Sequence, residues 1–233
     1  MRSLWHNRAA VDKGVDVDDL RAEWTALCGR MGLADDDTLW DGIAQAYGEP
    51  QRHYHTLVHI AAVVRDGQRV HAQFDDADVA LLALFFHDLI YDPARSDNEA
   101  QSAERMRALL ADDVDAGRLS RAERHILATK SHARTGDADT HLVLDIDMAI
   151  LGAAWTDYLA YAEGVAREYV PVYGLEAYAA GRANLFLTPT LARGPIFLTS
   201  AFAGCEGRAQ QNLAEELKLW TSGVFAERLK DAL

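Results

Sequence analysis

The chain has 233 residues, 49% of them hydrophobic, and a formal net charge of −13 from 23 Lys and Arg against 36 Asp and Glu. This length and composition fit one large globular domain, or at most two. An acidic chain without a basic cluster lacks the surface that binds phosphate backbones, so we expect no nucleic-acid partner. The acidity does not exclude a small anionic substrate, because a metal ion and nearby arginines can make the electrostatic potential positive within one cleft.

The N-terminus and the cysteines indicate the compartment. Residues 1–15 lack clear periodicity and the apolar core of a signal peptide, and we expect a loose arm there. No apolar run reaches the ~18–20 residues of a membrane span. Cys28 and Cys205 lie far apart and are too few for a disulfide framework, which is typical of thiols in a reducing compartment. We therefore predict a cytoplasmic protein that does not bind membranes.

Helical periodicity extends along the rest of the chain, and no segment alternates as a sheet strand does. Glycine, proline and aspartate separate the helical stretches. The predicted helices cover 16–33, 35–47, a segment running to about residue 74, 79–91, 96–110, 121–132, 142–151, 155–169, 175–187 and 196–220. The pattern predicts one all-α domain over residues 16–233.

The stretch Val79–Tyr91, VALLALFFHDLIY, is apolar or aromatic except for His87-Asp88. Apolar residues on every side predict a central, buried helix. Burying an imidazole and a carboxylate without partners costs roughly 1–3 kcal/mol or more each. The pair therefore needs hydrogen bonds or a metal ion.

Further metal-ligand types lie on both sides of this pair. His55 and His59 are four residues apart, so we expect them to share one helix face, and Asp145 and Asp147 come in a later apolar segment. Nitrogen and carboxylate ligands from separate buried helices suit a catalytic divalent ion with open positions for water. Such an ion lowers the pKa of bound water toward ~7 and neutralises charge on a phosphoryl oxygen.

The order His55, His87-Asp88, Asp147 resembles the HD superfamily of metal-dependent phosphohydrolases. The resemblance is narrower to a bacterial branch of predicted HD-type phosphohydrolases and extends over most of residues 40–185. It rests on the phrases EPQRHYHTLVHI, FFHDLIYDP, DNEAQSA, ATKSH, LDIDMAILG and VAREY. A lone His-Asp doublet is common, whereas this ordered set is specific.

The resemblance implies an HD-domain-like helical bundle and hydrolysis of a small, nucleotide-like phosphoester or phosphoanhydride. By position it assigns the metal to His55, His87, Asp88 and Asp147, with Asp145 as the alternative last ligand. The ion would be Mn, Mg, Co, Ni, Fe or Zn. Asp88 would also orient the attacking water.

The resemblance also suggests residues for proton transfer and substrate binding. Glu99 lies after the doublet in the NE-x-x-SA phrase and is either a general acid or base, or part of a capping box that starts at Ser96. Asp92 either ends the helix or assists proton transfer. Candidate contacts to the substrate phosphate are Arg52, His59, Lys130, His132, Arg167 and Arg182, for which salt bridges or ordinary core positions are the alternatives.

Two other functions stay open. Some proteins of HD fold hold two irons and use dioxygen, and His59 and His132 are the additional ligands available for that reaction. A non-catalytic binding module is the third reading, against which the intact ligand set argues. A homodimer is compatible with the composition, which gives no symmetry.

Overall fold

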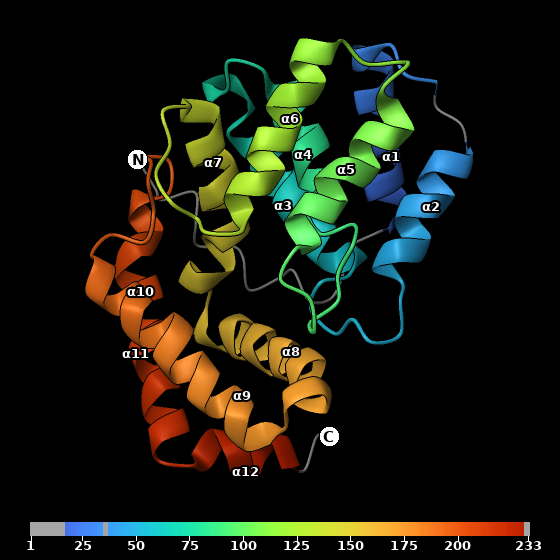
Figure 1. Cartoon of the computed structure of the whole chain (residues 1–233). Helices are drawn as coiled ribbons and strands as arrows, with labels where there is room; N and C mark the ends of the chain where they lie inside the picture. Colours follow the sequence, from blue (N-terminus) through green and yellow to red (C-terminus); the bar gives the residue numbers. More distant parts are fainter. Residues whose placement is uncertain (1–16, 35–36, 231–233) are drawn as a thin grey trace. The chain divides into compact units, whose positions relative to one another are not determined.

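The computed structural model describes residues 17–34 and 37–230, and these residues form helices, turns and loops without a strand (Figure 1). The predicted all-α class is confirmed. The arm expected at residues 1–15 lies outside the described residues. The chain separates into two compact units, a first unit that ends at Asp147 and a second that begins at Met148. The single domain over residues 16–233 stays a prediction.

The first unit is built around helix α4. Its helices are α1 (Val17–Met31), α2 (Asp37–Tyr47), α3 (Leu57–Arg69), η2 (His71–Gln73), α4 (Ala77–Phe86), α5 (Asn98–Leu110), α6 (Ala116–Thr129) and α7 (Ala138–Asp147). Helices α1, α3, α5, α6 and α7 contact α4, and every residue from Val79 to Phe86 is buried. Trp24 of α1 is fully buried with its ring edge-on to Phe85, 5.1 Å between centroids. The predicted central helix is confirmed, because an apolar segment with no polar face is stable only when surrounded.

The end of α4 differs from the prediction. The helix stops at Phe86, so His87-Asp88 lies in the turn beyond it rather than within a helix reaching Tyr91. Tyr47 donates a hydrogen bond to the carbonyl of Phe85 (2.9 Å), and the amide of Leu89 donates to the carbonyl of Phe86 (3.1 Å). These bonds satisfy carbonyls that a helix end leaves open. The apolar sequence Val79–Tyr91 does not predict that the helix ends at Phe86, because the hydrogen-bond donor Tyr47 lies outside this sequence.

The start of α5 also differs from the expectation. The helix begins at Asn98 with Asp97 as N-cap, and the Asp97 side chain makes no capping hydrogen bond. That carboxylate instead pairs with the Nε and Nη2 groups of Arg95, at 2.9 and 2.7 Å. The capping box predicted between Ser96 and Glu99 is therefore wrong. Glu99 lies in the first turn of α5, where the helix dipole favours a carboxylate.

A buried histidine joins α6 to α7, the helix that ends in Asp147. His125 is completely buried on α6, and its Nδ1 lies 2.8 Å from the hydroxyl of Thr140 on α7. The Nε2 atom is buried without a hydrogen-bond partner. Burial, the largest influence, lowers the pKa of His125 to about 4, so the imidazole is neutral near pH 7.

The second unit contains η3 (Met148–Gly152), α8 (Trp155–Tyr173), α9 (Leu175–Gly181), the π-helix η4 (Arg182–Leu187), α10 (Thr188–Arg193), η5 (Ala203–Cys205), α11 (Glu206–Thr221) and α12 (Val224–Lys230). Helix α8 continues through Pro171 beyond its predicted end at Tyr169. The helix predicted over residues 196–220 begins only at Glu206. The carboxylate of Glu206 accepts the amides of Ile196 and Phe197 at 3.0–3.1 Å, which turns that segment back onto the start of α11.

A buried ion pair lies at the centre of the second unit. Glu216 of α11 is fully buried and accepts hydrogen bonds from Arg182 (2.9 and 3.1 Å), Trp220 (3.0 Å) and the hydroxyl of Tyr158. Arg182, a candidate phosphate contact, is thus held inside the second unit by a carboxylate.

Across the described residues, no helix is both long and apolar enough to cross a lipid bilayer.

The pKa of His125 predicts a dependence of stability on pH. The unfolded imidazole has a pKa of ~6.5, so as the pH falls below that value the unfolded state takes up a proton that the folded state rejects until about pH 4. We expect this group to lower the free energy of unfolding by up to ~1.4 kcal/mol per pH unit across that window. His125→Gln should show a shallower pH dependence in urea unfolding. Equal slopes for both proteins between pH 6.5 and 4 would contradict this assignment.

Candidate metal centre

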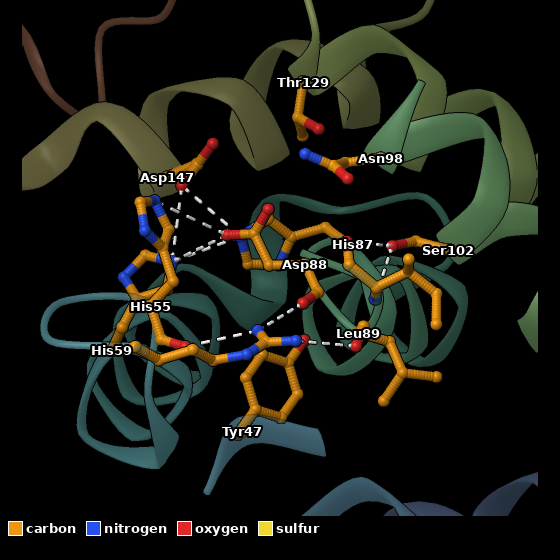
Figure 2. A network of polar contacts seen from close by, with 12 residues as sticks. Tyr47, His55, His59, His87, Asp88, Leu89, Asn98, Ser102, Thr129 and Asp147 are labelled. Carbon is orange, nitrogen blue, oxygen red and sulfur yellow. Dashed lines mark hydrogen bonds and ion pairs between the residues drawn. The ribbon is translucent and has the colours of Figure 1, made fainter. Parts of the chain in front are cut away.

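Four side-chain atoms converge at the C-terminal end of α4 (Figure 2). They are Nε2 of His59 on α3, Nε2 of His87 and Oδ2 of Asp88 in the turn after α4, and Oδ1 of Asp147 at the end of α7. The two imidazole nitrogens lie 3.1 Å apart. His87 Nε2 is 3.0 Å from Asp88 and 3.5 Å from Asp147, and His59 Nε2 is 3.7 and 3.6 Å from the same carboxylates.

These separations match the spacing of atoms that share one metal ion. Ligands about 2.1 Å from an ion lie about 3.0 Å apart in an octahedral arrangement and about 3.4 Å apart in a tetrahedral one. The group His59, His87 and Asp147 has the composition and closeness to hold a metal ion. Asp88 is not part of that group, but its Oδ2 lies 3.7 and 3.0 Å from the Nε2 atoms of His59 and His87, which makes it a candidate fourth ligand. The donor set therefore fits a divalent ion.

Hydrogen bonding prepares His87 for this role. Its Nδ1 lies 2.9 Å from the backbone carbonyl of Leu84, which can only accept a hydrogen bond. Nδ1 therefore carries a hydrogen, and in the neutral ring the lone pair lies on Nε2, the atom that faces the carboxylates. The last turn of α4 thus fixes both the ring orientation and the tautomer.

The charges in the cluster are strongly coupled. Burial and the nearby His87 lower the pKa of His59 to about 3, so its imidazole is neutral. Burial disfavours a charge on His87 as well, but Asp88 and Asp147 outweigh burial and raise the pKa of His87 well above its ordinary value. The pKa of each carboxyl is lowered, because attraction to His87 and hydrogen bonds to its neighbours exceed the effect of burial. A metal ion that binds here has to displace the His87 proton.

His55 lies beside the four-atom cluster rather than within it. Helix α3 begins at Leu57 with Thr56 as N-cap, so His55 precedes the helix, and the expectation that it shares a helix face with His59 is wrong. Its Nε2 is 4.0 Å from Asp88 Oδ2, and its ring packs against Tyr91, 4.2 Å between centroids. His59, expected as a substrate contact, has the place in the ligand group that the sequence assigned to His55.

His132 contacts the carboxylate of Asp147. Its Nε2 lies 2.9 Å from Asp147 Oδ2, the oxygen that does not face His87. Among the described residues, His132 is the only non-glycine residue with a positive φ (49°), and its amide donates to the carbonyl of Ala128 at the end of α6. This left-handed residue ends the helix and directs the imidazole to Asp147.

Arg52 lies beneath the cluster, buried among backbone carbonyls. Its Nη1 donates to the carbonyls of Asp88 (2.7 Å) and His55 (3.3 Å), its Nη2 to that of Leu89 (2.9 Å), and its Nε to Glu49 (3.0 Å). The guanidinium lies between the rings of Tyr47 and Tyr91, at 5.1 and 5.4 Å from their centroids. This placement supports a role in holding the site's backbone instead of the phosphate contact expected from the sequence.

The other predicted site residues lie outside the ligand group. Asp92 is exposed, and its carboxylate accepts the amide of Ala94 in a turn (2.8 Å). Lys130 is exposed at the end of α6 and contacts the carbonyl of Ser96. Arg167 belongs to α8 of the second unit. Asp145 is buried within α7, and the ligand group includes Asp147 instead.

Sequence reasoning missed three polar residues that hold the backbone around the doublet: Tyr47, Asn98 and Ser102. Burial and the nearby negative charge of Asp88 raise the pKa of the Tyr47 phenol well above its ordinary value, so the hydroxyl stays protonated and can donate. Asn98 and Ser102 are buried one turn apart on α5. A signal was present, since two small polar residues four apart mark one helix face.

Comparison of the chain with models of known families, with curated proteins and with solved structures found no match. The HD resemblance therefore stays a prediction, and a function for this chain has to be argued from the geometry of the cluster.

The arrangement predicts unequal roles for neighbouring histidines. We expect His59→Ala to weaken Mn²⁺ or Co²⁺ binding by more than ~100-fold, beyond the 10–100-fold typical of outer-shell partners, and His55→Ala to have a smaller effect. His53→Ala is the matched control, because His53 is exposed and lies in the same segment. Isothermal titration calorimetry on metal-stripped protein measures all three. Stronger dependence on His55 than on His59 would contradict the geometry.

Proposed function

We propose that the first unit is a metal-dependent hydrolase of small phosphoesters or phosphoanhydrides, with His59, His87, Asp88 and Asp147 holding a divalent ion. The single observation that carries this proposal is the pair of imidazole nitrogens at the end of a buried helix, which lie 3.1 Å from each other and 3.0–3.7 Å from carboxylate oxygens of Asp88 and Asp147. Two imidazoles and two carboxylates suit Mn, Fe, Co, Ni, Zn or Mg. When bound, such an ion supplies Lewis acidity and lowers the pKa of a coordinated water to about 7.

The carboxylates of Asp88 and Asp147 supply negative charge and acceptors on two sides of the cluster. Each side chain is 16% exposed, so both remain in contact with solvent, from which a water nucleophile comes. Asp88 is placed to accept a hydrogen bond from that water and orient it. His132 holds the outer oxygen of Asp147, so the inner oxygen keeps its direction toward His87.

His55 is the side chain best placed for proton transfer to a leaving group. It lies outside the ligand group, 4.0 Å from Asp88, and its side chain is 18% exposed. Histidine is the side chain that most often transfers protons in general acid–base catalysis. Glu99 and Asp92, the candidates from the sequence, do not belong to the cluster. We therefore transfer the role of general acid to His55.

The substrate class is inferred from the same contacts. Arg52 is engaged by backbone carbonyls, Lys130 by the carbonyl of Ser96 and His132 by Asp147. His55 is therefore the donor beside the cluster that we assign to the substrate phosphate. Few fixed donors favour a small substrate, and the HD resemblance favours a nucleotide-like one.

The di-iron oxygenase is a second candidate, favoured by one observation. His55 lies beside Asp88 and His132 beside Asp147, both outside the four-atom cluster. These two imidazoles are candidate ligands for a second ion. Two irons per chain and a visible or Mössbauer spectrum of coupled irons, in protein purified without added metal, would support it.

The proposed hydrolase predicts the outcome of a substrate screen. We expect phosphate release from nucleotides or small phosphate esters in the presence of Mn²⁺, Co²⁺, Ni²⁺, Mg²⁺, Zn²⁺ or Fe²⁺. His87→Ala and Asp88→Asn should lower kcat/KM by at least ~1,000-fold, because each removes a ligand. His71→Ala, an exposed histidine on η2, should retain activity. Full activity and metal content in His87→Ala would refute the proposal.

A further inference from the structure

The segment from Asp88 to Asp92 connects the metal centre to α5 without regular secondary structure. Such a segment leaves its amides and carbonyls without the partners that a helix supplies, and buried backbone groups of this kind need other partners. Leu89 and Tyr91 are nevertheless buried. What holds this backbone decides where the Asp88 carboxylate points.

Three side chains from outside the segment bind its backbone groups in succession. Arg52 donates to the carbonyls of Asp88 and Leu89. The hydroxyl of Ser102 accepts the amide of Ile90 (3.0 Å) and donates to the carbonyl of the same residue (3.3 Å). Figure 2 shows Ser102 at this segment, on the side away from Asp147.

Asn98 repeats this pattern two residues further along. Its Oδ1 accepts the amide of Asp92 (3.1 Å), and its Nδ2 donates to the carbonyl of Asp92 (2.9 Å). Asn98 and Ser102 are four residues apart on α5, so one helix face binds two alternate residues of this irregular segment, Ile90 and Asp92. Both side chains are buried, Ser102 completely.

We infer that Arg52, Asn98 and Ser102 form a backbone clasp that positions the Asp88 carboxylate in the metal centre. These are positioning residues, since they act through the backbone and not on the substrate. Arg52 also donates to the carbonyl of His55, so one guanidinium ties the segment before α3 to the turn after α4. The clasp therefore sets the distance between His55 and Asp88 as well.

The alternative is that these bonds only stabilise the fold, and the geometry argues against it. The bonds converge on the residues directly after the doublet, and the Arg52 contact is made by the carbonyl of Asp88 itself. A guanidinium fork reaches several carbonyls at fixed angles, which an ammonium group does not. A shift of this backbone changes the direction of the Asp88 carboxylate before it unfolds the helices.

The test measures metal binding, which does not require any hydrolytic activity. The variants are Arg52→Lys, Ser102→Ala and the pair Asn98→Ala with Ser102→Ala. The control is Leu110→Ala, which removes a buried side chain two turns beyond Ser102 on the same helix and lowers the stability of the fold. Co²⁺ is titrated into each protein, with calorimetry and visible absorption as readouts and urea unfolding as the measure of stability.

We expect the clasp variants to raise the Co²⁺ dissociation constant by about 10-fold or more and to shift the cobalt absorption bands. Leu110→Ala should bind within about 2-fold of the wild type with unchanged bands, although it loses stability. Unchanged affinity and spectrum in folded Ser102→Ala and Arg52→Lys would overturn the clasp. An equal loss of affinity in Leu110→Ala would overturn it too, because the effect would then track stability alone.

The backbone clasp depends on the proposed hydrolase only where it predicts a change in turnover. Experiments can therefore refute either proposal without refuting the other. If the wild type binds Co²⁺ but hydrolyses no phosphate compound, the hydrolase proposal fails and the loss of affinity in the variants still supports the clasp. If the wild type hydrolyses a substrate and the clasp variants keep their affinity, spectrum and kcat, the clasp fails and the hydrolase stands.

Discussion

The carbonyl groups at the end of α4 impose the constraint on which the first unit depends. A buried helix that stops inside the protein leaves its last carbonyls without intrahelical donors, and each open one costs about 1–3 kcal/mol. Tyr47 and His87 meet two of them, at Phe85 and Leu84, while Arg52 meets the carbonyls of Asp88 and Leu89. The hydrogen bonds to these carbonyls bring a phenol, a guanidinium and an imidazole together at the C-terminal end of α4.

The candidate metal-ligand group lies at the same point. His59 comes from the first turn of α3, and Asp147 ends α7, so both reach the end of α4 from helices that pack against it. The cluster thus joins three elements that are distant in sequence, and its charges oppose one another across 3.0–3.7 Å. Burial and the neighbouring His87 lower the pKa of His59, whereas Asp88 and Asp147 raise the pKa of His87 against the effect of burial.

Local composition was enough to predict the α class and the central position of α4, because an all-apolar helix must be covered. It failed at helix ends, where partners distant in sequence bind backbone groups. Tyr47 binds a carbonyl in the last turn of α4, and Glu206 binds the amides of Ile196 and Phe197 before the start of α11. The order of histidines and aspartates predicted which segments meet. It could not separate His55 from His59, because that depends on where α3 begins, and Thr56 sets the start. The spacing of Asn98 and Ser102 marks one face of α5, but it does not identify their partners, because these are backbone atoms of Ile90 and Asp92.

The left-handed conformation of His132 has a consequence for how this site can change during evolution. At φ of 49° the backbone tolerates glycine well and asparagine or aspartate moderately, while other side chains cost roughly 1–2 kcal/mol. Selection on the turn and selection on the imidazole therefore act on one position. Glycine or asparagine at this position would keep the turn and lose the contact between the imidazole and Asp147. Only histidine provides both the contact and an acceptable backbone conformation.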